Sequence, residues 1–105
     1  MERFKGVWLN THDVWVDARL VHPPLSPPQF KLLSLLYEQP GKIIPKSKMV
    51  STIWPDYEPS CVTSYAIDGL IQRLGKRLQQ TQPKHDYIQV VRGQGLRLVQ
   101  PDDEP

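Results

Sequence analysis

Residues 60–98 read SCVTSYAIDGLIQRLGKRLQQTQPKHDYIQVVRGQGLRL, and this stretch decides the fold. In its first half, apolar residues recur every three or four positions, which predicts an amphipathic helix over 60–79. The expected core face of that helix is Val62, Ala66, Ile67, Leu70, Ile71, Leu74 and Leu78. In its second half, two apolar-rich segments, 87–91 and 96–99, flank Arg92-Gly93-Gln94-Gly95. Because glycine accepts the backbone angles of a tight turn, these segments predict a β-hairpin.

Two further helices are expected upstream of this stretch. Ser26, Pro27 and Gln29 form a capping-box pattern with proline at the first helical position, and Pro40-Gly41 ends the helix. The apolar face of this helix comprises Phe30, Leu32, Leu33, Leu36 and Tyr37. A second, short helix is predicted over 46–54, with an apolar stripe of Met49, Val50 and Ile53.

The segments 4–9, 13–17 and 19–21 have strand character and predict a small N-terminal antiparallel sheet. The order sheet, helix, helix, helix, hairpin is that of an α+β winged helix-turn-helix domain. We place this domain at 13–99, with an N-terminal extension or first strand at 1–12 and an acidic tail at 100–105.

Composition fits one small domain with an anionic partner. The chain has 105 residues and a net charge of +2, but residues 61–100 contain six basic and two acidic residues, a net charge of +4. A locally basic half suits a polyanion. The single cysteine excludes an internal disulfide framework, and the sequence has neither a membrane-length apolar stretch nor a signal peptide. We therefore expect a cytoplasmic protein without membrane contact.

The sequence offers no catalytic, metal or cofactor pattern, so we do not expect an enzyme. His12, His22 and His85 are scattered, and Cys61 has no partner at ligand spacing. Gly93-Gln94-Gly95 lacks the third glycine and the following helix of a phosphate-binding loop.

Five strings, in order and at the right spacing, resemble the effector domain of the OmpR/PhoB family of response-regulator transcription factors. They are LSPPQFKLL (25–33), PGKII (40–44), MVSTIW (49–54), IDGLIQRLGKRL (67–78) and YIQVVRGQGLRL (87–98). The resemblance implies a four-stranded N-terminal sheet, a third helix that enters the DNA major groove, and a hairpin wing on the backbone or minor groove. It also implies the output module of a two-component system that binds tandem half-sites as a dimer.

Carried over by position, the implied DNA-binding residues are Tyr65, Asp68, Gly69, Gln72, Arg73, Lys76, Arg92 and Arg97. Helical geometry alone places most of those between 65 and 76 opposite the Leu70/Leu74 stripe. Arg73 suits guanine or a phosphate, and Gln72 suits adenine. Asp68 could accept from cytosine, orient Arg73 or be a plain surface carboxylate, and we favour the orienting role.

Four positions depart from the family. Gly69 stands where a small apolar residue is common, Gly75 and Gln72 replace basic residues, and Leu70 replaces a polar one. These changes remove positive charge and keep a rival open, a winged-helix module that docks a protein such as RNA polymerase or another regulator. Salt separates the two readings, because DNA binding weakens steeply with salt.

Overall fold

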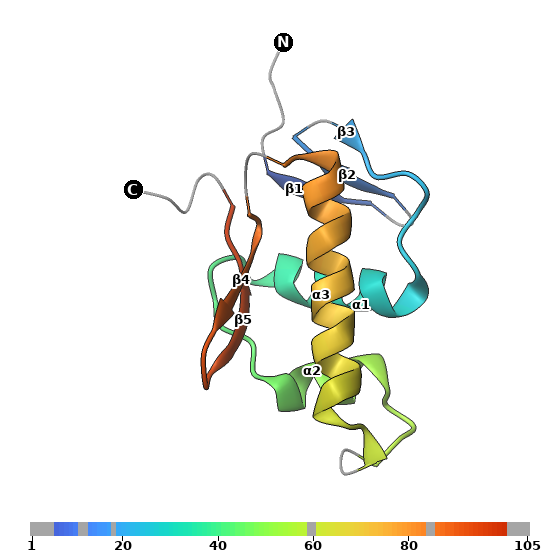
Figure 1. Cartoon of the computed structure of the whole chain (residues 1–105), viewed down its shortest axis with the longest axis vertical. Helices are drawn as coiled ribbons and strands as arrows, with labels where there is room; N and C mark the ends of the chain where they lie inside the picture. Colours follow the sequence, from blue (N-terminus) through green and yellow to red (C-terminus); the bar gives the residue numbers. More distant parts are fainter. Residues whose placement is uncertain (1–5, 11–12, 18, 59–60, 84–85, 101–105) are drawn as a thin grey trace.

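The computed structural model describes residues 6–10, 13–17, 19–58, 61–83 and 86–100 (Figure 1). The elements are β1 (Val7–Leu9), β2 (Val14–Val16), β3 (Arg19–Leu20), α1 (Pro27–Glu38), α2 (Lys46–Ile53), α3 (Ser64–Thr81), β4 (Ile88–Val91) and β5 (Gly95–Leu98). The predicted order of elements is confirmed. The predictions that concern His12, His85, a helix start at Ser60 and the acidic residues 102–104 lie outside the described residues.

The N-terminal sheet is antiparallel in the order β1-β2-β3, with Trp8 opposite Trp15 and Trp15 opposite Leu20. The resemblance implied four strands here, but the described residues form three. The amide of Val21 still donates to the carbonyl of Val14 at 2.8 Å, whereas the following Pro23 and Pro24 carry no N–H for further pairing.

Side-chain caps fix where the two longer helices, α1 and α3, begin. In α1 the predicted capping box is present, because Gln29 N donates to Ser26 Oγ and Ser26 N donates to Gln29 Oε1 at 3.0 Å. The helix predicted over 60–79 instead begins at Ser64 and ends at Thr81, because Thr63 Oγ1 accepts from Ala66 N and caps the first turn. Two residues assigned to its core face are therefore misplaced: Val62 precedes the helix and is half-buried, and Ala66 lies exposed in the first turn.

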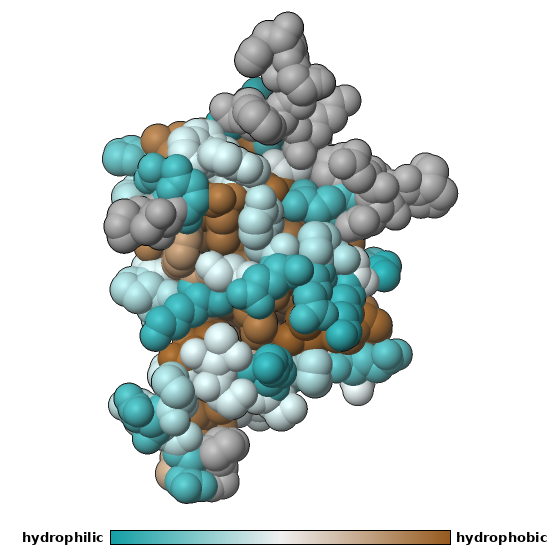
Figure 2. All heavy atoms as spheres, turned by 180° about the vertical axis from the view of Figure 1, so that it is seen from behind, coloured by the Kyte–Doolittle hydropathy of each residue, from teal (hydrophilic) through white to brown (hydrophobic). Residues whose placement is uncertain are grey.

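The three helices and the hairpin enclose one hydrophobic core. The largest fully buried side chains come from α1, α2, α3, β2 and β5: Leu32, Leu33, Leu36, Met49, Ile67, Leu74, Leu78, Leu96, Leu98 and Val16. Leu35 is also buried, although the sequence pattern did not place it in the core. The side of the molecule turned away from α3 intermixes hydrophilic and apolar residues (Figure 2).

The hairpin β4–β5, called the wing below, is fixed to the segment between α1 and α2. Ile44 N donates to Leu96 O at 2.7 Å, and Leu96 N donates to Ile44 O at 3.0 Å. Gly95 makes this approach possible: its φ is +147°, and a Cβ there would lie 2.1 Å from the carbonyl oxygen of Ile44. The wing therefore has a defined position on the body of the domain.

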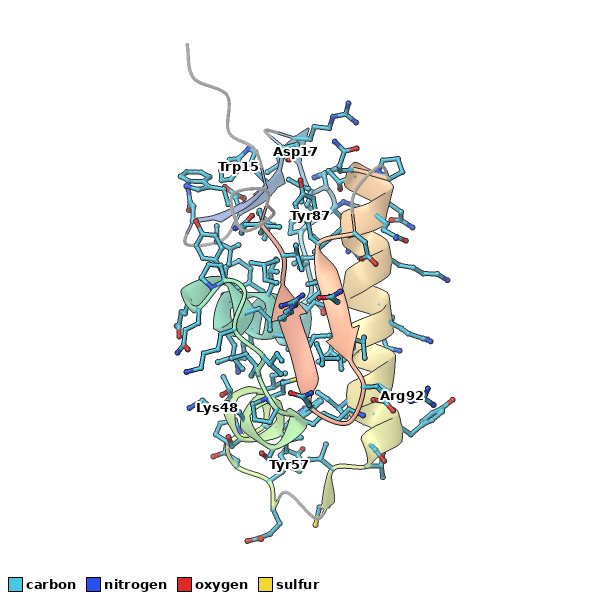
Figure 3. The ribbon with its side chains drawn as sticks, turned by 90° about the vertical axis from the view of Figure 1, so that its left-hand side faces the viewer. Trp15, Asp17, Lys48, Tyr57, Tyr87 and Arg92 are labelled. Atoms are coloured by element: carbon cyan, nitrogen blue, oxygen red, sulfur yellow. The ribbon has the colours of Figure 1, made fainter. Side chains whose placement is uncertain are left out.

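A polar cluster joins the N-terminal sheet to the far ends of α3 and the wing (Figure 3). The Asp17 carboxylate accepts hydrogen bonds from the amide of Gly6 at 2.6 Å, from the side chain of Gln82 at 2.7 Å and from the hydroxyl of the buried Tyr87. This cluster ties together segments that lie far apart in the sequence.

Candidate nucleic-acid interface

One face of α3 is buried and the opposite face is open to solvent. Ile67, Leu70, Ile71, Leu74 and Leu78 are buried and hold the helix against the core. Five of the six residues predicted for the groove-facing side of α3 are exposed, and Gly69 is half-exposed. These five are Tyr65, Asp68, Gln72, Arg73 and Lys76, and Tyr65 is 89% exposed. A helix with one such free face has the dimensions that a DNA major groove accepts.

The first half of this face is shallowly hollowed, with a volume of about 310 Å³. The hollow is lined by polar and apolar surface in about equal measure, from Tyr65, Ala66, Asp68, Gly69, Gln72 and Arg73. The structure therefore brings five of the predicted residues onto one concave patch, whereas Lys76 lies one turn further along the helix.

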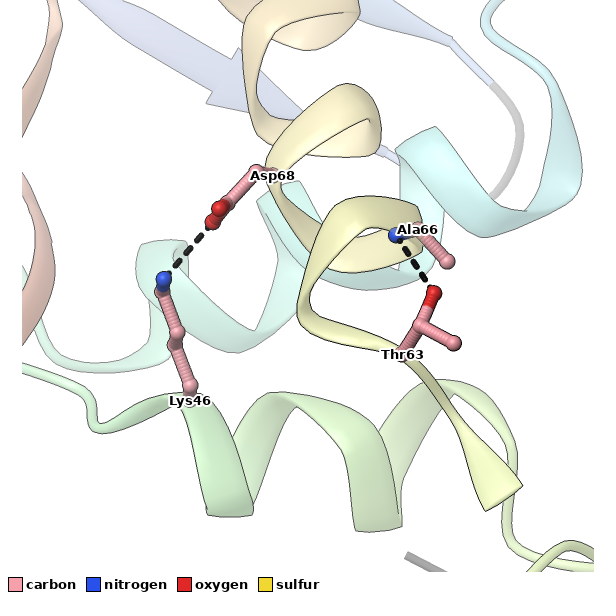
Figure 4. Close-up of polar contacts among 4 residues, drawn as sticks. All are labelled: Lys46, Thr63, Ala66 and Asp68. Carbon is pink, nitrogen blue, oxygen red and sulfur yellow. Dashed lines mark hydrogen bonds and ion pairs between the residues drawn. The ribbon is translucent and has the colours of Figure 1, made fainter. Parts of the chain in front are cut away.

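Asp68 is paired with a residue that the sequence did not single out. Lys46 Nζ lies 2.7 Å from Asp68 Oδ1, and the two side chains are 48% and 56% exposed (Figure 4). The prediction that Asp68 orients Arg73 is wrong for this structure, because α2 begins close enough to α3 for Lys46 to take the carboxylate. A lysine in the first turn of α2 opposes the helix dipole, and this is the signal that could have marked it as functional.

The wing adds a cation beside the same part of the molecule. Arg92 is exposed at the hairpin turn, and the tip of the wing lies level with the N-terminal half of α3 in both ribbon views (Figures 1 and 3). Between the wing and the start of α2 is a second hollow of about 460 Å³, lined by Pro45, Lys46, Val90, Val91, Arg92, Gly93, Gln94 and Gly95. Lys46 and Arg92 thus border a groove that separates α2 from the wing.

Two other cations, of which Arg97 was predicted for the interface, have partners inside the domain. Arg97 is half-buried, and its Nε donates to Gln89 Oε1 on the neighbouring strand. Arg77, part of the basic half of the sequence, donates from Nη2 to the carbonyl of Pro23. Among the described residues, the exposed cations of the first residue of α2, of the open face of α3 and of the wing turn are therefore Lys46, Arg73, Lys76 and Arg92. Asp68 is the carboxylate that lies among them.

The described residues contain no group of three or more metal-ligating side chains. Within that same part of the chain, no helix combines the length and the apolar character needed to cross a bilayer.

Known proteins share this sequence pattern. The family model described as "Transcriptional regulatory protein, C terminal" matches residues 22–98. The heme response regulator HssR of Staphylococcus haemolyticus is 40% identical over 85 residues, which cover 80% of this chain and 35% of that protein. The transcriptional regulatory protein BaeR of Escherichia coli is 32% identical over 73 residues, 70% of this chain and 30% of that protein. The chain thus spans about a third of the length of these relatives.

A solved structure shows the same fold. The DNA binding domain of the response regulator AdeR, crystallised in complex with an intercistronic region, superposes with a TM-score of 0.75 at 24% identity. The superposition covers 93% of this chain and 98% of that one. Together with the family match over most of the sequence, this confirms the winged helix-turn-helix fold and the resemblance drawn from the motifs. The chain belongs to the family of C-terminal effector domains of transcriptional regulatory proteins, of the OmpR/PhoB type.

Proposed function

We propose that this chain is the DNA-binding output domain of a transcription regulator, with α3 in the major groove and the wing on the adjacent backbone or minor groove. One observation carries the proposal: Arg73, Lys76 and Arg92 are exposed on two elements that the core fixes side by side. Family membership and the AdeR domain, which was crystallised in complex with an intercistronic region, support it. The unit that binds is 13–99, to which β1 adds a strand.

The roles divide between attraction and readout. Lys76 and Arg92 supply phosphate contacts, which fix the register of the protein without reading sequence. Arg73 reads guanine through its two parallel N–H groups, and Gln72 reads adenine. Tyr65 extends from the first turn of α3 and contacts a phosphate through its hydroxyl.

The Lys46–Asp68 pair belongs to this surface as well. An uncompensated carboxylate near the DNA backbone would repel phosphate, and Lys46 offsets the charge of Asp68. The pair is exposed, so its contribution to fold stability is small, about 0–1 kcal/mol. Its role is to keep an uncompensated negative charge off the surface that meets DNA.

The proposed assembly is two copies on tandem half-sites about 10–10.5 base pairs apart, the spacing that places both recognition helices on one side of the duplex. A single domain binds weakly, because Lys46 is paired with Asp68 and only Arg73, Lys76 and Arg92 remain for DNA, and a second copy raises the affinity through its own contacts.

The experiment is an equilibrium titration of the domain with labelled duplex DNA across a range of salt concentrations. With phosphate contacts from two cations per domain, Lys76 and Arg92, the slope of log K against log salt is expected to be about −1.8 for one copy and about −3.6 for two copies on tandem half-sites. A slope near zero with the protein folded would contradict the proposal.

A second candidate function is a protein-docking module whose partner is RNA polymerase or another regulator. The observation that favours it is the exposure of large hydrophobic side chains, with Val90 of the wing 65% and Tyr57 61% exposed. Tyr57 lies in the connection between α2 and α3 (Figure 3). An interface of this kind would keep its affinity as salt rises, so the same titration, run with the candidate partner, separates the two functions.

A further inference from the structure

The two glycines of α3 have different surroundings. A Cβ placed on Gly69 would lie 3.3 Å from Arg73 Nη1, 3.6 Å from Nη2 and 3.7 Å from Cζ. A Cβ placed on Gly75 would have nothing within 4 Å. The guanidinium of Arg73 therefore rests on the bare backbone of Gly69, whereas Gly75 borders open space.

Helix geometry explains the contact. Side chains of a helix lean toward its N-terminus, and residues four apart lie one above the other on the same face. Arg73 consequently reaches back over the turn that contains Gly69, whose Cα lies about 6 Å away along the helix axis. A Cβ at 69 would crowd the guanidinium and require a shift of a few tenths of an ångström, and a larger side chain would have to displace it further.

This arrangement moves the functional group of Arg73 toward the start of α3. The N-terminal turns of a recognition helix are the ones that meet base edges in the major groove. Glycine is among the residues least favoured in a helix interior, so Gly69 weakens α3 locally while it leaves room for the guanidinium.

We propose that Gly69 is a specificity-determining position, whose missing side chain lets Arg73 lie back along the helix and present its guanidinium to a base beside the first turns of α3. The inference rests on the proposed DNA-binding function and deepens it. Gly69 is a positioning residue and Arg73 is the reading residue. The hollow lined by both residues, together with Asp68 and Gln72, is the place where that base edge fits.

The test compares wild type with Gly69→Ala, Gly69→Val, Arg73→Ala and the double variant Gly69→Val/Arg73→Ala. The probe is the duplex that wild type enriches most from a random pool, together with duplexes that change each of its base pairs in turn. Gly75→Ala is the matched control, because it removes a glycine from the same helix without touching Arg73.

We expect Arg73→Ala to lose discrimination at one base pair or two adjacent ones by about fivefold or more, the lower bound for a bidentate contact. Gly69→Val is expected to lose discrimination at the same base pairs, and Gly69→Ala to lose part of it, because its Cβ forces a shift of only a few tenths of an ångström. The double variant is expected to match Arg73→Ala, and Gly75→Ala to match wild type.

Melting curves show that each variant is folded, and Gly69→Ala is expected to melt above wild type because alanine favours the helix. If wild type binds its selected duplex and both Gly69 variants keep the wild-type profile, the role of Gly69 is refuted while the proposed function stands. If the double variant loses more than Arg73→Ala alone, Gly69 does not act through Arg73. If wild type itself enriches no sequence, the proposed function fails and this inference with it.

Discussion

Replacement of Gly95 by alanine is expected to detach the wing from the body of the domain. The new Cβ would lie 2.1 Å from the Ile44 carbonyl oxygen, 2.7 Å from its carbonyl carbon and 2.9 Å from Pro45 Cα. All three atoms belong to the backbone, so no side-chain rotation relieves the overlap. The strand has to move, and the two hydrogen bonds between Ile44 and Leu96 are lost.

The expected loss in the free energy of unfolding has two contributions. Two lost backbone hydrogen bonds reduce the free energy of unfolding by about 1–3 kcal/mol. A positive φ at a residue with a side chain adds about 1–2 kcal/mol. We therefore expect Gly95→Ala to lower the free energy of unfolding by roughly 2–5 kcal/mol, a large part of the ~5–15 kcal/mol that a domain has in total.

Gly93→Ala is the matched control. Gly93 lies in the same turn with φ +75°, but a Cβ there would have nothing within 4 Å. Gly93→Ala should lower the free energy of unfolding only by the cost of a positive φ at a residue with a side chain, about 1–2 kcal/mol. Urea denaturation followed by circular dichroism measures both variants. If Gly95→Ala is no more destabilising than Gly93→Ala, the contact between the wing and Ile44 does not stabilise the domain.

Three further changes have defined outcomes. Ser26→Ala removes the N-cap of α1 and should lower the free energy of unfolding by about 1 kcal/mol in the same urea assay; no change would mean that the capping box is dispensable. Tyr87→Phe removes a hydrogen-bond donor to the Asp17 carboxylate and should lower the free energy of unfolding by about 1.5–3 kcal/mol, the range for a hydrogen bond to a charged group. A smaller loss would mean that this hydrogen bond does not stabilise the polar cluster around Asp17. Lys76→Ala removes one phosphate contact, so the slope of log K against log salt for DNA binding should become shallower by about 0.9. Lys48 lies on the side of α2 away from α3 (Figure 3), and Lys48→Ala should leave that slope unchanged. Equal effects of the two substitutions would remove Lys76 from the interface.

Local patterns predicted the elements of this fold well because their signals are short-ranged. The capping box of Ser26 and Gln29, the stop at Pro40-Gly41 and the two-glycine turn of the wing each depend on a few neighbouring residues. The start of α3 was misplaced for a related reason: the helical spacing of Val62 and Ala66 extended the pattern past Thr63, whose side chain caps the helix. Periodicity alone does not reveal where a cap interrupts it.

The features of the site that the sequence did not predict depend on contacts between distant segments. Lys46 meets Asp68 only because α2 and α3 pack together, and a sequence pattern within α3 cannot show that partner. Arg97 was predicted for the interface by position, yet the register of the hairpin sets it beside Gln89. The contact between Gly69 and Arg73 lies within one helix and was readable in principle from the spacing of four.

Sequence-specific DNA binding by α3 and the wing is tested most directly by selection of bound sequences from a random duplex DNA pool at low and moderate salt. Wild type is compared with Arg73→Ala/Arg92→Ala, and with Arg73→Lys/Arg92→Lys, which keeps the charge but not the bidentate geometry. We expect an enriched motif for wild type, no enrichment for the alanine pair, and DNA retention with a weakened motif for the lysine pair. If the folded wild-type domain enriches no motif at either salt concentration, or if the alanine pair enriches the same motif, then α3 and the wing do not read DNA as proposed.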